Sequence, residues 1–463
     1  MQQNSERVDP EFAEKEEGAM AERNAEDTQT RAIQLTAALL IAFALAFFFY
    51  YGLNTINDPV FGIDFLPYHV AGRLVATGNV EPLTDYARTG SFAATSGPFL
   101  DYFHQYFFPD SPSATHWIYL PGYAWIFRPL AGLEFPLAAR VWLTINAVLS
   151  LGCIALLWSA RPWTGAKNLA TWRTAWIVFF GLTFQPILDN MWHGNISALI
   201  FFAFCLSYWL LRRGHYWLAG LVLGLIVPLK FYPAIFVLYF AWRRNWSLVA
   251  GAVVGCVAIL ALSLLTAGWA GNLAYVQMVW TELRGGGIPA FNNQSISGFL
   301  LHAFTQGDVN AWGDIETPLV FSILRLALVG AFIGVVAWAL RRRPEDTTDP
   351  AMSQDLDLAL VIGVMLLASP ITWYHYYVWL LFPLIVLFDQ LLVSPTTNTR
   401  QILLLAIGYG LVVVQGIVVI RPFAAQAIQD VWLLRVLLSQ SFFGAVALMF
   451  LLWRSRLAIA RIE

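Results

Sequence analysis

Long apolar runs recur along almost the whole chain, and they limit its possible folds more than any other feature. They lie near residues 31–52, 135–159, 172–188, 195–212, 216–229, 231–242, 247–267, 317–340, 356–371, 375–392, 401–420 and 432–453. A helix needs about twenty apolar residues to cross a bilayer, and most of these runs approach that length although some are short. The sequence therefore predicts an all-α, polytopic membrane protein with about twelve transmembrane helices.

Composition agrees with this class. Hydrophobic residues make up 58% of the chain and charged residues 12%, whereas about a quarter of a soluble domain is charged. The net charge of -2 gives no sign of a nucleic-acid partner. Cys153, Cys205 and Cys256 lie inside apolar runs, so they indicate neither a disulfide framework nor a metal site.

The first thirty residues differ from the rest. Residues 1–30 are polar and acidic, which predicts a disordered cytoplasmic tail ahead of a single transmembrane domain over 31–463. The run from Arg31 to Leu53 is too long for the core of a signal peptide and has no small-residue cleavage site after it. We therefore expect it to be a retained first helix.

Clustered basic residues predict the topology. They occur near 161–173, 212–213, 243–244, 341–343, 400 and 454–461. Cytoplasmic loops are enriched in Lys and Arg, and alternating the runs from a cytoplasmic start places every cluster inside. Both termini are then cytoplasmic in the inner membrane, and residues 53–116 and 268–316 form long external loops.

The apolar stretch 117–133 does not fit this alternation. It is broken by Pro121, Gly122 and Pro129, and a single crossing here would move every later basic loop outside. We predict a re-entrant or interfacial hairpin, because irregular backbone at this depth needs surrounding protein or a water-filled cavity. An ordinary kinked crossing, with one exception to the charge rule, is the alternative.

Most of the histidines and other unusual polar residues are expected on the outer side of the membrane. Six of the seven histidines are expected there, namely His69, His104, His116, His193, His302 and His375. Few ionisable groups lie at mid-membrane, and no internal repeat is visible. Proton-driven transporters, in contrast, tend to have acids at the midplane and internal repeats. The segment Ser369–Tyr377 combines a helix breaker, a His and four aromatics, which suits a polar, ring-shaped substrate held at the membrane surface.

Six short motifs occur in order along the chain. They are Asp64-Phe65-Leu66-Pro67-Tyr68, Tyr119-Leu120-Pro121-Gly122, His193-Gly194-Asn195, Leu229-Lys230-Phe231-Tyr232-Pro233, Asn292–Gly298 and Ser369–His375. Together they resemble the GT-C superfamily of membrane glycosyltransferases, specifically glycosyltransferase family 87. The His193 motif lacks the family's Gln, and the Tyr119 motif is a partial match.

The resemblance implies a specific reaction. Such enzymes take a hexose, here most simply mannose, from a polyprenyl-phosphate donor and pass it to a hydroxyl of a lipid-linked or glycan acceptor on the outer face of the membrane. The family implies a single inverting displacement, with no nucleotide sugar, no required metal and no cofactor. Membrane lipids are the other expected partners.

Asp64 and His375 are the predicted catalytic residues. The acceptor hydroxyl must lose a proton, and a positioned carboxylate base contributes roughly 10²–10⁴-fold. His375 is expected to lie within hydrogen-bond reach of Asp64, or one water away, and an ionised Asp there would raise its pKa. A solvated loop Asp and a structural interfacial His are the plain alternatives.

Lys230 is the predicted contact of the donor phosphate, with Arg325 and Arg421 as weaker candidates. The leaving phosphate gains a second negative charge, so a nearby cation stabilises the transition state more than the ground state. Lys230 could equally extend to the interface as a plain anchor. Arg435 is a further weak candidate, and a membrane Arg without a ligand usually pairs with a carbonyl or an acid.

The remaining predicted substrate contacts come from the same motifs. They are Tyr68, Tyr119, His193, Asn195, Asn293, Gln294, Ser295 and Trp373. The Asn292–Ser297 run could instead be a turn that caps a helix, since Asn and Ser favour such positions. Histidines and acids look scattered, with no ligand pair at short helical spacing, so the sequence predicts no metal site.

Two other functions stay open at this point. A flippase or transporter of a lipid-linked glycan would move its substrate without breaking the bond between sugar and phosphate. A membrane acyltransferase acting on surface polymers would need a His deep in the bundle, and the sequence offers none.

Overall fold

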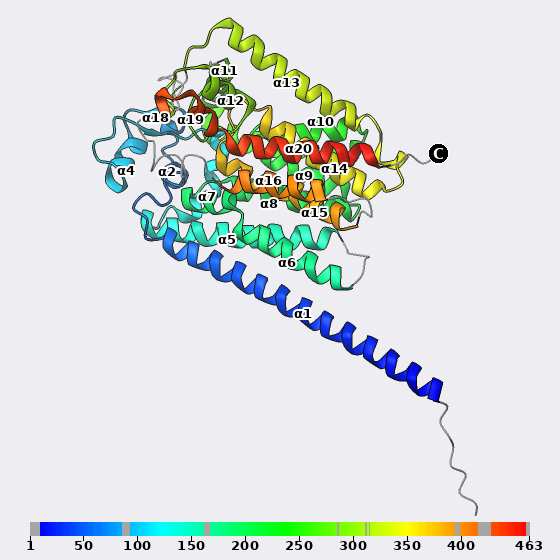
Figure 1. The fold of residues 1–463 in the computed structure, drawn as a ribbon. Coiled ribbons are helices and arrows are strands. Elements are labelled where there is room, and N and C mark those ends of the chain that lie inside the picture. Colours follow the sequence, from blue (N-terminus) through cyan, green and yellow to red (C-terminus); the bar gives the residue numbers. More distant parts are fainter. Residues whose placement is uncertain are drawn as a thin grey trace, which may run out of the picture.

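The computed structural model describes residues 10–85, 93–161, 167–284, 287–310, 313, 315–393, 399–414 and 427–459. Long helices lie side by side in one bundle, and α1 (Pro10–Thr55) extends well beyond it (Figure 1). The other helices of the bundle, long and short, are α5 (Phe135–Ala160), α6 (Lys167–Thr183), α8 (Ser197–Arg212), α9 (Tyr216–Ile226), α10 (Ala234–Trp242), α11 (Trp246–Arg284), α13 (Leu319–Leu340), α14 (Pro350–Leu367), α15 (Leu381–Val393), α16 (Thr399–Val413) and α20 (Gln440–Ala458).

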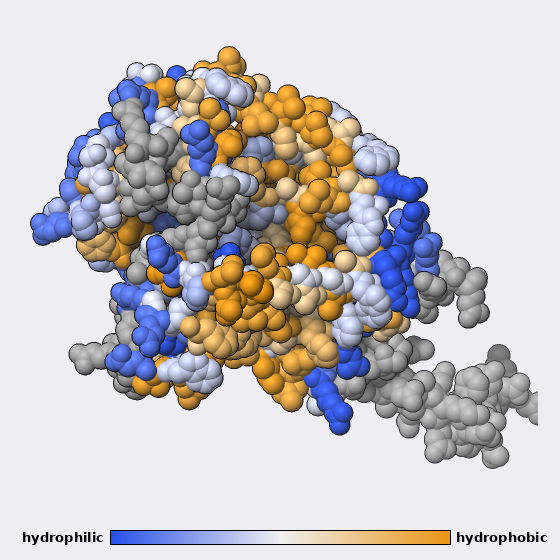
Figure 2. Space-filling view, turned by 90° about the horizontal axis from the view of Figure 1, so that it is seen from above, coloured by the Kyte–Doolittle hydropathy of each residue, from blue (hydrophilic) through white to orange (hydrophobic). Residues whose placement is uncertain are grey.

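Six of the described helices are long and apolar enough to cross a membrane. They are the apolar part of α1, together with α5, α11, α13, α14 and α20, while α8, α9 and α16 are shorter apolar helices. Figure 2 shows hydrophobic residues across the middle of the molecule and hydrophilic residues towards both ends. The predicted class, an all-α polytopic membrane protein, is confirmed.

Short elements gather at the end of the bundle that carries α2, α4 and α7, here called the loop-rich end (Figure 1). Two-residue strands β1 (Ala93–Ala94) and β2 (Ala114–Thr115) pair antiparallel beside α4. The helical elements are α2 (Leu66–Thr77), η1 (Glu81–Thr84), α4 (Pro98–Tyr106), η2 (Pro121–Ile126), η3 (Arg128–Leu130), α7 (Gln185–His193), α12 (Ile296–Phe304), η5 (Tyr374–Leu380), α18 (Ala427–Asp430) and α19 (Trp432–Leu437). The short η4 (Pro344–Asp346) follows α13.

Several elements differ from their predicted bounds. Proline explains two of these differences, because it removes a backbone donor and breaks or begins a helix. Pro186 lies in the first turn of the separate short α7, and Pro233 precedes the nine-residue α10. Residues 10–30 of the predicted disordered tail are helical and run into the apolar part of α1. Their six Glu and four Ala residues have high helix propensity.

The stretch 117–133 forms two short 3-10 helices instead of one membrane-length helix. Gly122 N–H donates to Ser263 Oγ over 3.1 Å, and Tyr123 Oη donates to the Leu225 carbonyl over 2.6 Å. The irregular backbone is therefore surrounded by α9 and α11, as backbone at membrane depth requires.

Helices α9 and α11 pack unusually closely. A Cβ atom built on Gly220, Gly224, Gly251 or Gly255 would collide with the backbone of the opposite helix. Small residues allow this approach between membrane helices. The packing matters for function because the chain leaves α9 directly towards Lys230.

Buried ion pairs join helices at the opposite end of the bundle. Asp357 on α14 accepts from Arg243 Nη2 over 2.6 Å and from Arg456 Nε on α20. Asp389 on α15 accepts from Arg173 Nε on α6 over 2.8 Å. We call this the basic end, and its pairs lock helices that are far apart in sequence.

An apolar pocket of about 610 Å³ lies between α13 and the rest of the bundle. It is lined by Ile296, Phe299, Leu328, Phe332, Val335, Val336, Leu360, Leu367, Phe442, Val446, Met449, Phe450 and Trp453.

A candidate active site at the loop-rich end

Asp64 is held against the end of α7. Its backbone N–H donates to the His193 carbonyl over 2.9 Å, and Gly62 N–H donates to the Trp192 carbonyl over 3.0 Å. Gly194, which ends α7, has a φ of 68°. A Cβ built on Gly194 would lie 2.9 Å from Phe65 Cβ, so glycine is required there for both conformation and space.

Asn195 orients the Asp64 carboxylate. Its Nδ2 donates to Asp64 Oδ2 over 2.9 Å. Its Oδ1 accepts from the backbone N–H and the hydroxyl of Ser197, over 3.1 and 2.8 Å. These two donors fix which end of the amide faces Asp64. The sequence predicted Asn195 as a substrate contact, whereas the structure gives it a bond to the predicted base.

Lys230 is buried beside aromatic rings. Its Nζ lies 3.8 Å from the centroid of the Tyr376 ring and 5.9 Å from that of Tyr119. Within the described residues Nζ has no hydrogen-bond partner. Burial lowers the pKa of Lys230 to about 7, and the nearby Asp64 carboxylate opposes this shift. A buried ammonium without a partner is costly, so this position favours an anionic ligand.

Tyr68 and Tyr119 form one side of the site. Their hydroxyl oxygens lie 3.0 Å apart, and both side chains are buried. Burial raises the pKa of each phenol, so both stay protonated at neutral pH and keep a hydroxyl donor. The structure thus brings Asp64, Lys230 and these two tyrosines together from widely separated motifs.

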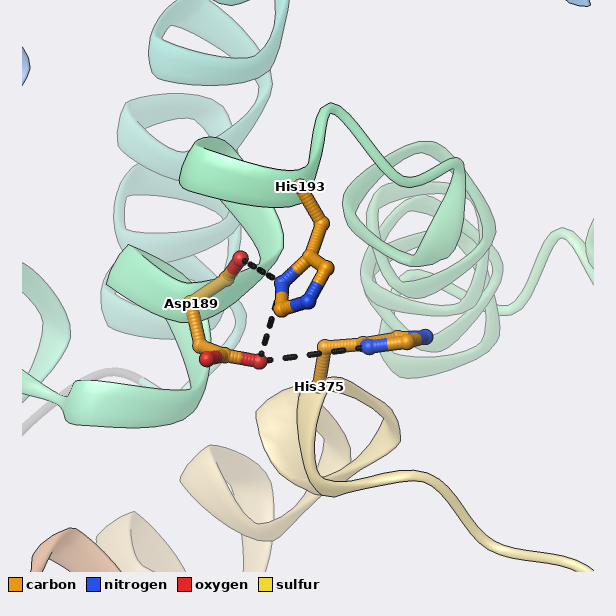
Figure 3. A group of neighbouring side chains, drawn as sticks. All are labelled: Asp189, His193 and His375. Atoms are coloured by element: carbon orange, nitrogen blue, oxygen red, sulfur yellow. Dashed lines mark hydrogen bonds and ion pairs between the residues drawn. The ribbon is translucent and has the colours of Figure 1, made fainter. Parts of the chain in front are cut away.

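Asp189, His193 and His375 form a cluster between α7 and η5 (Figure 3). His193 Nδ1 donates to the Asp189 carbonyl over 2.9 Å and lies 3.4 Å from Asp189 Oδ2. His375 Nδ1 lies 3.9 Å from the same Oδ2. Burial lowers the pKa of His193, but the Asp189 carboxylate outweighs this and raises it to about 9.

A direct hydrogen bond between His375 and Asp64 is not found in the described part of the chain, and the expected contact through one water stays a prediction. In the described part of the chain the acid within ion-pair distance of His375 is Asp189. The expected rise in the pKa of His375 is also wrong. Burial, followed by the charges of His193 and Lys230, lowers that pKa well below its usual value. His375 is therefore a neutral ring near neutral pH.

The polar motif before α12 is bonded within the protein. Asn293 Oδ1 accepts from the Thr372 backbone N–H over 3.1 Å, and Asn293 pairs with Trp373 as an isolated bridge. Gln294 Nε2 donates to the Phe291 and Leu438 carbonyls, each over 2.9 Å. Ser295 caps α12 by accepting from Gly298 N–H over 3.0 Å. The alternative of a helix-capping turn is confirmed for Ser295, and the motif joins two loops.

Arg325 and Arg435 are not among the residues that gather around Asp64. Arg325 is on α13, whose main neighbours are α12, α14 and α20. Arg435 Nε donates to the His302 carbonyl over 3.1 Å, which is the carbonyl pairing expected of a membrane Arg. Arg421 lies outside the described residues.

Sequence reasoning missed Asp189 and Tyr376. The expectation that no ligand pair occurs at helical spacing is wrong, because Asp189 and His193 are four residues apart on α7. The predicted runs stopped at 188 and resumed at 195, so a short helix between them was overlooked. The spacing of an acid and a His by four residues was the signal.

Comparison with known proteins identifies the family. The model of glycosyltransferase family 87 matches residues 117–370, more than half of the chain. The chain belongs to glycosyltransferase family 87. Its matched range includes Lys230, while Asp64 and His375 lie outside it.

Relatives of this family 87 chain include mycobacterial mannosyltransferases. A polyprenol-phosphate-mannose-dependent alpha-(1-2)-phosphatidylinositol mannoside mannosyltransferase of Mycolicibacterium smegmatis is 30% identical over 58% of the chain and 60% of its own length. A polyprenol-phosphate-mannose-dependent alpha-(1-2)-phosphatidylinositol pentamannoside mannosyltransferase of Mycobacterium tuberculosis is 25% identical over 70% of the chain and 68% of its own length. No solved structure matches. The chain thus belongs to a glycosyltransferase family and spans 60% of the length of the first of these relatives, and both relatives are named polyprenol-phosphate-mannose-dependent mannosyltransferases.

Proposed function

We propose that this family 87 protein transfers a hexose, mannose in the simplest case, from a polyprenyl-phosphate donor to an acceptor hydroxyl. One observation carries the proposal. Asn195 orients the Asp64 carboxylate, which lies close enough to the buried Lys230 ammonium to affect its pKa, and that ammonium has no hydrogen-bond partner among the described residues. A base and an anion-binding group at one site are what glycosyl transfer from a phosphodiester needs.

The chemical step is a single inverting displacement. The acceptor oxygen attacks the anomeric carbon while the bond from that carbon to the phosphate oxygen breaks. Asp64 takes the acceptor proton, and the lipid phosphate leaves with its second negative charge. Lys230 stabilises that developing charge, which lowers the barrier because the charge is larger in the transition state than in the ground state.

We place the site on the external face of the cytoplasmic membrane, with about twelve crossings and both termini cytoplasmic. Support comes from the positions of the charges. The arginines of the basic end lie in predicted cytoplasmic clusters, and the site lies at the loop-rich end. Basic residues favour the cytoplasmic side.

The donor tail and the acceptor follow from their chemistry. The apolar pocket beside α13 begins at Ile296 and Leu367, next to the loops joined by Asn293 and Trp373. It suits a polyprenyl chain, which would leave the sugar at the loop-rich end. The relatives' names specify phosphatidylinositol mannosides, so a lipid-linked mannoside is the first acceptor to test.

The test is turnover with a labelled donor. Protein purified in detergent is incubated with polyprenyl-phosphate-[¹⁴C]mannose and a phosphatidylinositol mannoside, and the label in product is measured. We expect transfer by the wild type and a loss of about two or more orders of magnitude in Asp64→Asn, which keeps the shape but is a far weaker base. Intact donor with the wild type, or normal turnover by Asp64→Asn, would contradict the proposal.

A further inference from the structure

The cluster of Asp189, His193 and His375 has the composition of a metal site. Two imidazoles and one carboxylate are ligands that Zn²⁺ and similar divalent transition metals favour, whereas Mg²⁺ and Ca²⁺ prefer oxygen ligands alone. The three residues each offer one ligand atom, and these atoms lie within 4.8 Å of one another. We propose that this cluster binds a divalent transition metal, with Zn²⁺ as its representative.

The geometry is close to what a metal requires. Metal–ligand bonds of about 2.0–2.2 Å place ligand atoms about 3.3–3.5 Å apart in a tetrahedral site. His375 Nδ1 and Asp189 Oδ2 are 3.9 Å apart, so small side-chain rotations bring them to this distance (Figure 3). Asp189 and His193 share one face of α7. That short helix is anchored to the loop of Asp64, so the pair is already positioned.

His375 gives the independent evidence. It is 4% exposed, and both of its ring nitrogens lack a hydrogen-bond partner within the described residues. Buried polar atoms are nearly always satisfied, so an unpaired buried imidazole points to an absent ligand. A plain ion pair between Asp189 and His193 leaves these nitrogens unexplained.

The hydrogen bond of His193 to the Asp189 carbonyl also fits a metal site. The hydrogen bond from His193 Nδ1 to the Asp189 carbonyl holds one tautomer and leaves Nε2 free as the ligand nitrogen. Metal-binding histidines usually donate their other N–H to such an acceptor. Three protein ligands leave a fourth position open, as in sites that bind an exchangeable oxygen ligand.

The surrounding charges can accommodate the ion. With the metal bound, both imidazoles are neutral ligands. The divalent cation, the carboxylates of Asp64 and Asp189 and the ammonium of Lys230 then sum to one positive charge, which the phosphodiester of the proposed donor balances. Only this last step depends on the proposed function.

Metal content tests the proposal without any enzymatic assay. Protein carrying no His tag is stripped with a chelator, incubated with ZnCl₂ or MgCl₂ and desalted, and bound metal is measured by mass spectrometry. We expect about one Zn²⁺ and no retained Mg²⁺ per chain, and at least about tenfold weaker Zn²⁺ binding in Asp189→Asn, His193→Gln and His375→Gln. His104→Gln, at a His bonded to the Ser111 carbonyl, is the matched control and should bind like the wild type.

Two results would overturn the site. One is wild-type protein that keeps no Zn²⁺, and the other is binding that all three variants retain. Size-exclusion profiles show whether each variant is folded. Replacing Zn²⁺ with Co²⁺ in the wild type gives a second readout, since visible absorption reports nitrogen and oxygen ligation at a tetrahedral site. Sugar transfer by metal-free protein would leave the proposed function standing, and only the metal measurements decide the site.

Discussion

At the scale of single residues, the Asp64 carboxylate depends on its neighbour Asn195. The amide donates to one carboxylate oxygen, and Ser197 holds the amide in turn. The orientation of a catalytic base matters because a small misplacement of a reacting group lowers the reaction rate by a large factor. Asn195 is therefore a positioning residue in the proposed reaction.

Asn195→Ala should lower kcat about ten- to a hundredfold while KM for the donor changes less than about threefold. The reason is that the base loses its orientation while the donor site stays intact. Steady-state kinetics with labelled donor measure both constants. Asn310→Ala, at an exposed Asn that bonds Asp308, is the control. An equal change in kcat and KM, or none, would argue against positioning.

Lys230 should make donor binding depend on pH. With a pKa of about 7 the free ammonium is partly neutral at neutral pH and mostly neutral by pH 9. A bound phosphate favours the charged form, so binding takes up a proton and weakens as pH rises from 7 to 9, by up to about tenfold per unit. Donor Kd measured across this range in Asp64→Asn protein avoids turnover.

Lys230→Met in the same Asp64→Asn background is the comparison. It should bind donor weakly at every pH and show no slope between pH 7 and 9. A slope that persists in this variant would assign the titration to another group, and unchanged affinity would make Lys230 a plain anchor.

The sequence could predict part of this site. The motifs named Asp64, Lys230, Tyr68 and Tyr119, and the fold brings these four together. The sequence could not predict that Asp189 would face His375, because that contact depends on how α7 packs against η5. A contact between distant segments is set by tertiary packing, and neither segment carries a local sequence pattern that predicts it.

At the scale of elements, the contact between α9 and α11 has no spare room. Glycines on each helix face the backbone of the other. The contact also fixes where α9 ends, and Lys230 follows that end. Stability and donor binding therefore depend on the same interface.

Gly224→Val should separate these helices. The added side chain meets the Ala252 backbone, and overpacking costs about 1–3 kcal/mol of stability. We expect a lower Tm in detergent together with weaker donor binding. Gly330→Val on α13, where nothing lies within 4 Å of the added Cβ, is the control and should match the wild type. Equal melting of both variants would refute the role of close packing.

Long apolar helices were predictable, whereas short ones were not. α13 and α5 follow predicted runs closely, because length and hydropathy suffice for a helix that faces lipid. Runs at 216–229 and 231–242 became helices of 11 and 9 residues. Their ends depend on Pro233 and on tertiary contacts around Lys230, which hydropathy does not record.

At the scale of the whole molecule, the two ends should face opposite sides of the membrane. Single cysteines at the exposed positions Thr95 and Asp346 test this in a background that lacks Cys256. A membrane-impermeant maleimide added to intact cells should label the first and spare the second, as the basic clusters predict. Labelling of both positions from outside would refute the topology, and lysed cells control for reactivity.

Arg456 gives the bundle an order of assembly. Its guanidinium pairs with Asp357 inside the protein, yet Arg456 lies 99 residues further along the chain. A ribosome makes the chain from its N-terminus, so Asp357 enters the membrane long before this partner exists. Until then Asp357 has Arg243 but lacks its second cation, and an incompletely paired buried charge destabilises the bundle. The finished bundle therefore forms only after α20 has been made, and a premature stop codon ahead of Arg456 would leave the nascent chain open to quality-control proteolysis.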